Sequence, residues 1–188
     1  MTATDTREII MSAARAVVQA EGYNALSFRE LAKEVGVKSA SIHYHFPTKG
    51  DLGAALARRY TEDLETYLAE LSASSSEPSV LLRRYTAIFR QPLVNENRMC
   101  MYGIMAAEHD ALPDAVRAEL DRFIDANIRW VAGVLGLHPN SEGDDANRRH
   151  ARAIFAAIEG AQLIARGRRD VSIFDETIES YRKAGLLP

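Results

Sequence analysis

Polar side chains able to contact nucleic acid are concentrated between residues 27 and 49 of this 188-residue chain. Hydroxyl, imidazole and cationic groups recur there at short intervals, and such groups bond phosphate oxygens and the edges of bases. A small alanine among them permits close approach or touches a thymine methyl group. The candidate contact residues are Ser27, Arg29, Lys38, Ser39, Ala40, Ser41, His43, Tyr44 and Lys49.

A short helix is predicted over residues 28–35, at the start of this region. Its apolar residues follow the i, i+3, i+4, i+7 spacing of a helix with one buried face, at Phe28, Leu31, Ala32 and Val35. Ser27 and Glu30 have the spacing of a capping box at its beginning. Gly36 favours a tight turn at its end, because glycine readily adopts a left-handed backbone conformation.

A second short helix is predicted over residues 39–45, and it carries the densest group of candidates. At about 100° per residue, Ile42 and Phe46 point inward. The opposite face then presents Ala40, Ser41, His43 and Tyr44. Two helices joined in this way, with a polar outward face on the second, predict a helix-turn-helix that reads DNA.

Individual roles follow from position along the second helix, whose N-terminal end normally enters the major groove first. Ser41 is placed to bond a base or a phosphate, whereas His43 and Tyr44 at the far end are placed to hold phosphate. Arg29 and Lys49 are either phosphate anchors or plain solvated cations, and the sequence leaves both alternatives open. His45 is interpreted as a packed or capping residue, and Phe28 and Phe46 as core.

Catalytic and metal-binding motifs are not found in the sequence. His43 and His45 are two residues apart, so on a helix they point about 200° apart and cannot share a metal ion. There is no glycine-rich phosphate loop, no GxSxG and no HExxH sequence. We therefore predict no enzymatic activity, no metal and no cofactor.

The run GVKSASIHYHFPTKGDL, residues 36–52, resembles the N-terminal signature of the TetR/AcrR family of bacterial transcriptional regulators. Matches to the first helix of that family and its exit turn continue upstream, at Arg7, Ile9, Ile10, Ala13, Ala14, Gly22 and Tyr23. Two residues depart from the pattern: Lys38 stands where a capping Ser or Thr is common, and His43 where Tyr is common. The resemblance implies a homodimeric repressor that binds pseudo-palindromic double-stranded operator DNA and responds to a small-molecule effector.

Composition and charge agree with a DNA-binding head on an acidic body. The net charge is −3, but residues 1–60 hold eight Lys and Arg against six Asp and Glu, and the remainder holds fifteen against twenty. No apolar run is long enough to span a membrane, and the N-terminus lacks the pattern of a signal peptide. A single cysteine fits a reducing compartment, so a cytoplasmic location is expected.

The fold class predicted from periodicity is all-α, with a three-helix helix-turn-helix head and a six-helix ligand-binding and dimerisation body. The head is expected to occupy residues 5–65 and the regulatory domain residues 66–188. Beyond the two reading helices, the segments expected to be helical are 6–21, 48–71, 80–90, 93–109, 113–137, 144–168 and 173–184. Ser72 to Ser79 is predicted to be a loop, and the first helix is expected to bury Ile9, Ile10, Ala13, Val17 and Ala20.

The segment 146–168 has a surface of small residues with aliphatic flanks, at Ala153, Ala156, Ala157, Gly160, Ala161 and Ile164. Small residues permit close approach of helices, either inside one subunit or between two. The family resemblance implies that the last two long helices form the dimer interface, and a two-fold operator requires two heads. Dimerisation through these helices is the prediction, and ordinary core packing is the alternative.

The segment CMYGIMAAE, residues 100–108, is similar to one in a branch of the family. That branch holds the repressors related to the one controlling N-ethylmaleimide reductase, and the acrylate-responsive repressors. A cysteine at the matching position senses electrophiles and oxidants in the former, so the resemblance implies Cys100 as a sensor, with Arg98 able to lower its pKa. The alternative is a small buried apolar residue. The candidates for lining an effector pocket are Tyr85, Phe89, Tyr102, Met105, Phe123 and Trp130.

The function predicted from the sequence is therefore a DNA-binding transcriptional regulator, a homodimeric repressor released from its operator by a small molecule or by an electrophile or oxidant. The alternative from a different class is an all-helical interaction module or small enzyme with a vestigial head. Salt-dependent DNA affinity discriminates between the two.

Overall fold

The structure of the chain is a computed structural model, which describes residues 3–138 and 143–188. Within those ranges it contains nine α-helices and one short 3-10 helix, and no strand. The all-α prediction is confirmed. The contacts divide the chain into two compact units, one of residues 1–61 with 101–122 and the other of residues 62–100 with 123–188. The sequence-based boundary between residues 65 and 66 remains a prediction.

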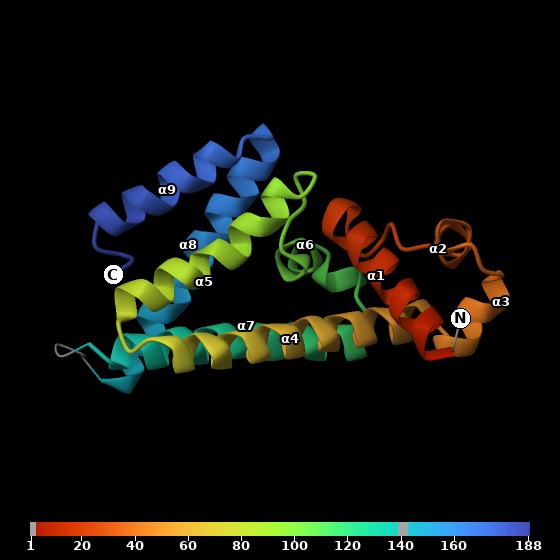
Figure 1. Cartoon of the computed structure of the whole chain (residues 1–188), viewed down its shortest axis with the longest axis horizontal. Helices are drawn as coiled ribbons and strands as arrows, with labels where there is room; N and C mark the ends of the chain where they lie inside the picture. The colour runs from red at the N-terminus through yellow and green to blue at the C-terminus, as the bar shows by residue number, and fades with distance from the viewer. Residues whose placement is uncertain (1–2, 139–142) are drawn as a thin grey trace. The chain divides into compact units, whose positions relative to one another are not determined.

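The first unit is built around α1 (Ala3–Glu21), α2 (Phe28–Val35) and α3 (Ser39–His45). The beginning of α4 (Lys49–Ser74) lies with them, and Figure 1 shows these four elements gathered together. The unit also contains α6 (Met101–Ala107), the 3-10 helix η1 (His109–Ala111) and the beginning of α7 (Asp114–Gly136).

The buried side of α1 is rotated from the one predicted. Ile10, Met11, Ala14 and Val18 are buried, whereas Ile9 is 41% exposed and Ala20 is also exposed. Both sets have helical spacing, so periodicity alone could not choose between them. The contacts of α1 with α2, α3 and α6 decide the matter.

The start of α4 confirms a predicted cap. The Thr48 hydroxyl accepts a hydrogen bond from the Asp51 backbone N–H (3.1 Å), and the Asp51 carboxylate accepts one from the Thr48 backbone N–H (2.9 Å). This reciprocal pair fixes where the chain turns from α3 into α4. Gly53, one turn further on, lies against Tyr23: a Cβ atom there would be 2.5 Å from the Tyr23 ring.

The second unit combines the end of α4 and most of α7 with α5 (Pro78–Val94), α8 (Asp144–Arg168) and α9 (Val171–Lys183). Figure 1 shows α9 alongside α8 and α5, and contacts join all three. The core of the unit is rich in aromatic residues, with Tyr85, Phe89, Phe123 and Phe174 among its most buried side chains.

Two predicted boundaries were wrong. The loop expected over residues 72–79 is shorter, because α4 continues to Ser74 and α5 already begins at Pro78, a residue favoured in the first turn of a helix. The helix expected over residues 93–109 is interrupted: its first two residues end α5, and α6 follows only after a turn. Glu96 and Asn97 adopt left-handed conformations (φ 61° and 56°), which end α5 before α6 begins at Met101.

Pro92 lies inside α5 rather than before a new helix. It is two residues from the end of the helix, so its missing N–H removes only one late hydrogen bond. Its carbonyl accepts a hydrogen bond from the Arg98 N–H (2.9 Å), which closes the turn that follows. In the described part of the chain, no helix is long and apolar enough to cross a membrane.

Candidate nucleic-acid interface

The turn between α2 and α3 has the geometry that the sequence predicts. Gly36 caps α2 in a left-handed conformation (φ 74°), and the Val37 N–H reaches back to the Ala32 carbonyl (3.0 Å). At the start of α2, the Ser27 hydroxyl accepts a hydrogen bond from the Glu30 N–H (3.4 Å). The Glu30 carboxylate instead binds the Lys33 ammonium (3.0 Å), so only half of the predicted capping box forms.

The helix α3 is anchored by two side chains beneath it. Ile42 is 0% exposed and Phe46 is 2% exposed, as the helical wheel predicts. On the other side Tyr44 is 79% exposed, Ala40 and His43 are also exposed, and Ser41 is half-buried. The α3 outer face, defined as Ala40, Ser41, His43 and Tyr44, therefore carries a hydroxyl, an imidazole and a phenol on a rigidly held helix.

His43 is partly held by its neighbours. Its ring packs edge-on against the Phe28 ring (centroids 4.9 Å apart), and its Nδ1 lies 3.3 Å from the Pro47 carbonyl oxygen. Phe28 is half-buried, not core, because its contact with the exposed His43 lies at the edge of the unit. These contacts fix the plane of the imidazole beside Tyr44.

Lys49 is bound within the first unit and is half-buried. Its ammonium donates a hydrogen bond to the Asn24 carbonyl (3.0 Å) and lies 4.7 Å from the centre of the Tyr23 ring. Burial lowers the pKa of Lys49, and the nearby charge of Glu108 opposes that shift. Neither sequence-based alternative included this arrangement, which holds the lysine against the loop before α2.

Glu108 is a supporting residue that the sequence did not indicate. Its carboxylate accepts hydrogen bonds from the backbone N–H groups of Tyr23 (2.6 Å) and Asn24 (3.3 Å), across more than eighty residues of chain. It therefore fixes the loop that receives Lys49. No local pattern reveals such a contact, because it depends on α6 packing beside α1.

The remaining candidates lie at the ends of the two helices. Lys38 precedes α3 and makes no side-chain capping bond, and Ser39 begins the helix; both are exposed. Arg29 is exposed near the start of α2, with its Nε 3.9 Å from the Glu30 carboxylate. Ser27 is half-buried, and because its oxygen already accepts the capping bond, its hydroxyl proton is what it can offer a phosphate.

Comparison with known proteins agrees with this geometry. Residues 10–56 match the model of the bacterial regulatory proteins of the tetR family. A solved TetR transcriptional regulator from Legionella pneumophila is 31% identical, with a TM-score of 0.87, and the match covers 94% of this chain and 95% of that one. This chain belongs to the TetR family.

Two further relatives support the assignment. A TetR-family transcriptional regulator from Agrobacterium tumefaciens is 26% identical, with a TM-score of 0.88, over 97% of this chain and 98% of that one. The HTH-type transcriptional regulator LmrA of Bacillus subtilis is 30% identical over 76 residues, which is 40% of each chain. The chain thus spans less than half of that curated relative. Its relatives are transcriptional regulators, and it has the fold of a DNA-binding regulator.

The predicted effector residues of this TetR-family regulator fall in both units. In the second unit, the Tyr85 ring stacks on Trp130 (5.3 Å between centroids) and contacts Phe89 edge-on (5.2 Å). Phe89 and Phe123 each pack against Phe155 (6.1 and 6.3 Å). These five rings, Tyr85, Phe89, Phe123, Trp130 and Phe155, are called the aromatic cluster below.

Tyr102 and Met105 belong to the first unit and are buried there. The Tyr102 hydroxyl lies 2.8 Å from the Thr61 hydroxyl, 2.8 Å from the Ala57 carbonyl and 3.1 Å from the Glu119 carbonyl. It therefore joins α6 to α4 and α7 inside the first unit. Its part in an effector pocket remains a prediction.

Cys100 is buried in the second unit, 1% exposed. Its backbone N–H donates to the Gln162 side-chain oxygen (2.9 Å), and its thiol forms a hydrogen bond that lowers the pKa of Glu159. Burial of Glu159 outweighs that bond and raises its pKa to about 7. Arg98, predicted to help lower the pKa of the thiol, forms an ion pair with Glu96, and its Nε is buried without a hydrogen-bond partner among the described residues. The group beside the thiol is thus a carboxyl.

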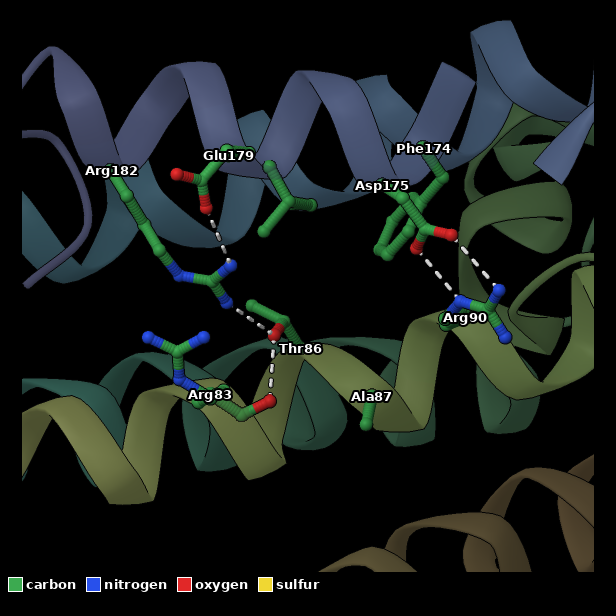
Figure 2. Close-up of a pocket in the computed structure, with 9 residues that line it drawn as sticks. Arg83, Thr86, Ala87, Arg90, Phe174, Asp175, Glu179 and Arg182 are labelled. Atoms are coloured by element: carbon green, nitrogen blue, oxygen red, sulfur yellow. Dashed lines mark hydrogen bonds and ion pairs between the residues drawn. The ribbon is translucent and has the colours of Figure 1, made fainter. Parts of the chain in front are cut away.

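A groove of about 180 Å³ lies between α5 and α9, with Phe174 and Ile178 on its apolar side. Figure 2 shows how its charged residues are used. Arg90 forms two bonds with the Asp175 carboxylate (2.7 and 2.9 Å), and Arg182 reaches the Thr86 hydroxyl (3.3 Å) as well as Glu179 (3.6 Å). These charges mainly join α9 to α5, so we interpret the groove as part of that packing.

Proposed function

We propose that this TetR-family regulator is a homodimeric repressor that binds pseudo-palindromic double-stranded operator DNA through the α3 outer face. The observation that carries the proposal is that Ala40, His43 and Tyr44 of this face are exposed while Ile42 and Phe46 are buried beneath the helix. A rigid helix with an exposed polar face fits the major groove, which is wide enough to admit an α-helix.

Each candidate has a role in this proposal. Ala40 and Ser41 approach base edges, and Ser39, His43 and Tyr44 contact phosphates beside them. Ser27, Arg29, Lys38 and Lys49 position the head on the backbone. Lys49 can do so from its bound position, because an ammonium has three hydrogens and the bond to Asn24 uses one.

Dimerisation through α8 and α9 is supported by apolar surface on α8. Leu163 is 58% exposed and Ile164 is 57% exposed, and the small residues Ala153, Ala156 and Gly167 are also exposed on this helix. Large exposed aliphatic side chains next to small ones are typical of surfaces that pack against a second helix. Ala161 faces the core of its own unit instead.

Release by an effector is supported by how α4 is shared. Its residues 49–61 belong to the first unit and its residues 62–74 to the second. In the second unit, the Trp130 indole N–H lies within hydrogen-bond distance of the Leu68 carbonyl (3.1 Å) and the Ser72 hydroxyl (2.9 Å). Suppose that the contact between Trp130 and α4 can be either formed or broken. A ligand that binds one of these two states more tightly shifts the position of α4, and with it the affinity for DNA.

The test begins by footprinting the purified protein on the DNA beside its gene, followed by fluorescence anisotropy with the protected sequence. We expect affinity to fall linearly with salt on a logarithmic plot, and two heads to bind one site. Ultracentrifugation should give a dimer that Ile164→Glu dissociates. Unchanged operator affinity in both Tyr44→Ala and Ala40→Glu would show that α3 is not the reading helix.

The electrophile response is tested separately, by repeating the anisotropy titration after exposure to N-ethylmaleimide. Loss of operator binding in the natural protein but not in Cys100→Ser supports a sensor role for Cys100. The same loss in both proteins, or in neither, assigns Cys100 to the core.

A further inference from the structure

The Glu159 carboxyl is the most unusual polar group in the second unit. Both of its oxygens are buried, and no N–H or O–H group of the described residues donates a hydrogen bond to either. Buried carboxylates normally have a cation or several hydrogen-bond donors around them, because losing hydration otherwise costs several kcal/mol. A carboxyl held in this way commonly belongs to a functional site.

The groups around Glu159 are engaged elsewhere. The Tyr85 hydroxyl donates to the Asn127 side-chain oxygen (2.7 Å). Gln162, one turn further along α8, donates its amide to the Phe89 carbonyl and accepts from the Cys100 N–H. Cys100 is the titratable group that acts on the pKa of the carboxyl, and the carboxyl in turn helps to raise the pKa of Tyr85; neither residue is a cation. No cation of the described residues is among the groups that shift the pKa of Glu159.

Aromatic rings lie close to this carboxyl. Phe155 precedes Glu159 by four residues and therefore lies on the same side of α8, one turn away. It packs against Phe89 and Phe123, and Phe89 continues to Tyr85 and Trp130. A negative charge beside several aromatic faces is the combination that recognises an organic cation, because both attract positive charge.

We propose that Glu159 and the aromatic cluster form the effector site, and that the effector is a small organic cation: an amine with an apolar or aromatic body. This inference rests on the proposed function, because it names the ligand class of the proposed repressor. The ammonium hydrogens satisfy the Glu159 oxygens, and the body packs among the rings of α5, α7 and α8.

Binding at this position requires the cluster to open. Tyr85, Phe89 and Phe123 are each at most 2% exposed, so the rings must move apart to admit a ligand. Trp130 belongs to the cluster and also bonds α4 at Leu68 and Ser72. Opening the cluster therefore disturbs the bonds of Trp130 to α4, the helix that begins with Lys49. In this way, binding of the cation can change the affinity for DNA.

The test measures thermal unfolding of the full-length protein with three probes of similar shape and different charge: benzylammonium, benzyl alcohol and benzoate. At about pH 8, where Glu159 is ionised, about 10 mM benzylammonium should raise the Tm by several degrees. The alcohol and the benzoate should shift it by less than about a third as much. Glu159→Gln, which keeps the shape and removes the charge, should abolish the response to benzylammonium.

Glu176→Gln is the matched control, since Glu176 is an exposed carboxylate on α9 of the same unit. Its response to benzylammonium should equal that of the natural protein. Lowering the solution to about pH 5.5 should weaken benzylammonium binding at least tenfold, because a proton then competes for the carboxylate. Calorimetry at the two pH values measures this directly.

An equal response to benzyl alcohol, or a full response in Glu159→Gln, overturns the inference. So does the absence of any response to benzylammonium in the natural protein. Operator affinity, measured on the same samples, separates this from the proposed function. A protein that binds its operator but not the cation refutes only the effector class, whereas a protein that binds the cation but no DNA refutes only the repressor.

Discussion

The α3 outer face and the surroundings of Glu159 differ in the exposure of their polar groups. On α3, His43 and Tyr44 are exposed while Ile42 and Phe46 are buried beneath them. In the second unit the carboxyl itself is buried among aromatic rings. An exposed polar group costs little until a partner arrives, whereas a buried one costs stability continuously. The comparison indicates that the α3 outer face serves contact with a partner, and that Glu159 is kept although its buried charge lowers the stability of the fold.

The sharpest test of this comparison is the stability of Glu159→Gln. The folded pKa of Glu159 is about 7 and its ordinary value is 4.5, so the folded state holds the proton more tightly than the unfolded chain. The contribution of Glu159 to the free energy of unfolding is therefore fully present below about pH 4.5 and is lost as the pH rises through about 7. At about pH 8 the substitution should raise the free energy of unfolding by on the order of 3 kcal/mol.

Urea unfolding at several pH values measures this effect. The difference between the two proteins should shrink at acidic pH, where the carboxyl of the natural protein is already neutral. A variant less stable than the natural protein at about pH 8 would mean that the Glu159 carboxylate has a stabilising partner beyond the Cys100 thiol.

The opposite outcome is expected on α3, where a new charge should damage binding and spare stability. Ala40→Glu places a carboxylate on the exposed face that we propose enters the groove, so operator affinity should fall about 100-fold, or roughly 2.7 kcal/mol. Anisotropy at fixed salt measures the loss. Ala20→Glu, also at an exposed alanine of the first unit, is the control and should leave affinity within about threefold.

A smaller effect is expected from Tyr44→Ala. The side chain is 79% exposed, so its removal should not change the Tm. Loss of one phosphate contact should weaken operator binding about tenfold, or roughly 1.4 kcal/mol. If the loss were confined to single base pairs of the operator, Tyr44 would be a base reader, and titrations with operator variants distinguish the two roles.

The smallest expected effect contrasts two carboxylates. Glu108 accepts hydrogen bonds from Tyr23 and Asn24, whereas Glu159 has no such donors. Glu108→Gln weakens charge-assisted bonds, so it should lower the free energy of unfolding by about 1 kcal/mol. The same substitution thus has opposite signs at the two sites. If urea unfolding showed that both substitutions change the free energy of unfolding in the same direction, hydrogen bonding would not explain the difference between the two carboxylates.

Local patterns predicted the first unit well where the signal lay within a few residues. The bounds of α2 and α3, the left-handed Gly36 and the reciprocal cap of Thr48 and Asp51 are all as expected. The buried side of α1 was not, because Ile9 and Ile10 are equally apolar and only packing against other helices separates them. The break at Glu96 and Asn97 also carried no glycine or proline to mark it.

The candidate site divides in the same way. The sequence predicted the outward side of α3, but it gave Lys49 only as a solvated cation or a phosphate anchor and did not indicate a carboxyl beside Cys100. In the structure Lys49 binds the Asn24 carbonyl, and the neighbour of the thiol is Glu159. Glu108 and Glu159 were missed, since the hydrogen bonds of the first and the burial of the second depend on residues far away in the chain.

What the sequence determined by itself is the set of helices and the outward face of α3, because helical periodicity and capping act over only three or four residues. The tertiary structure alone decided which carboxyl receives backbone hydrogen bonds and which is buried without them. Glu108 and Glu159 have the same side chain, and only the packing of distant helices gives one of them two N–H donors and leaves the other without an N–H or O–H donor among the described residues. Burial and hydrogen bonding are properties of neighbours in space, and the order of residues along the chain does not specify them.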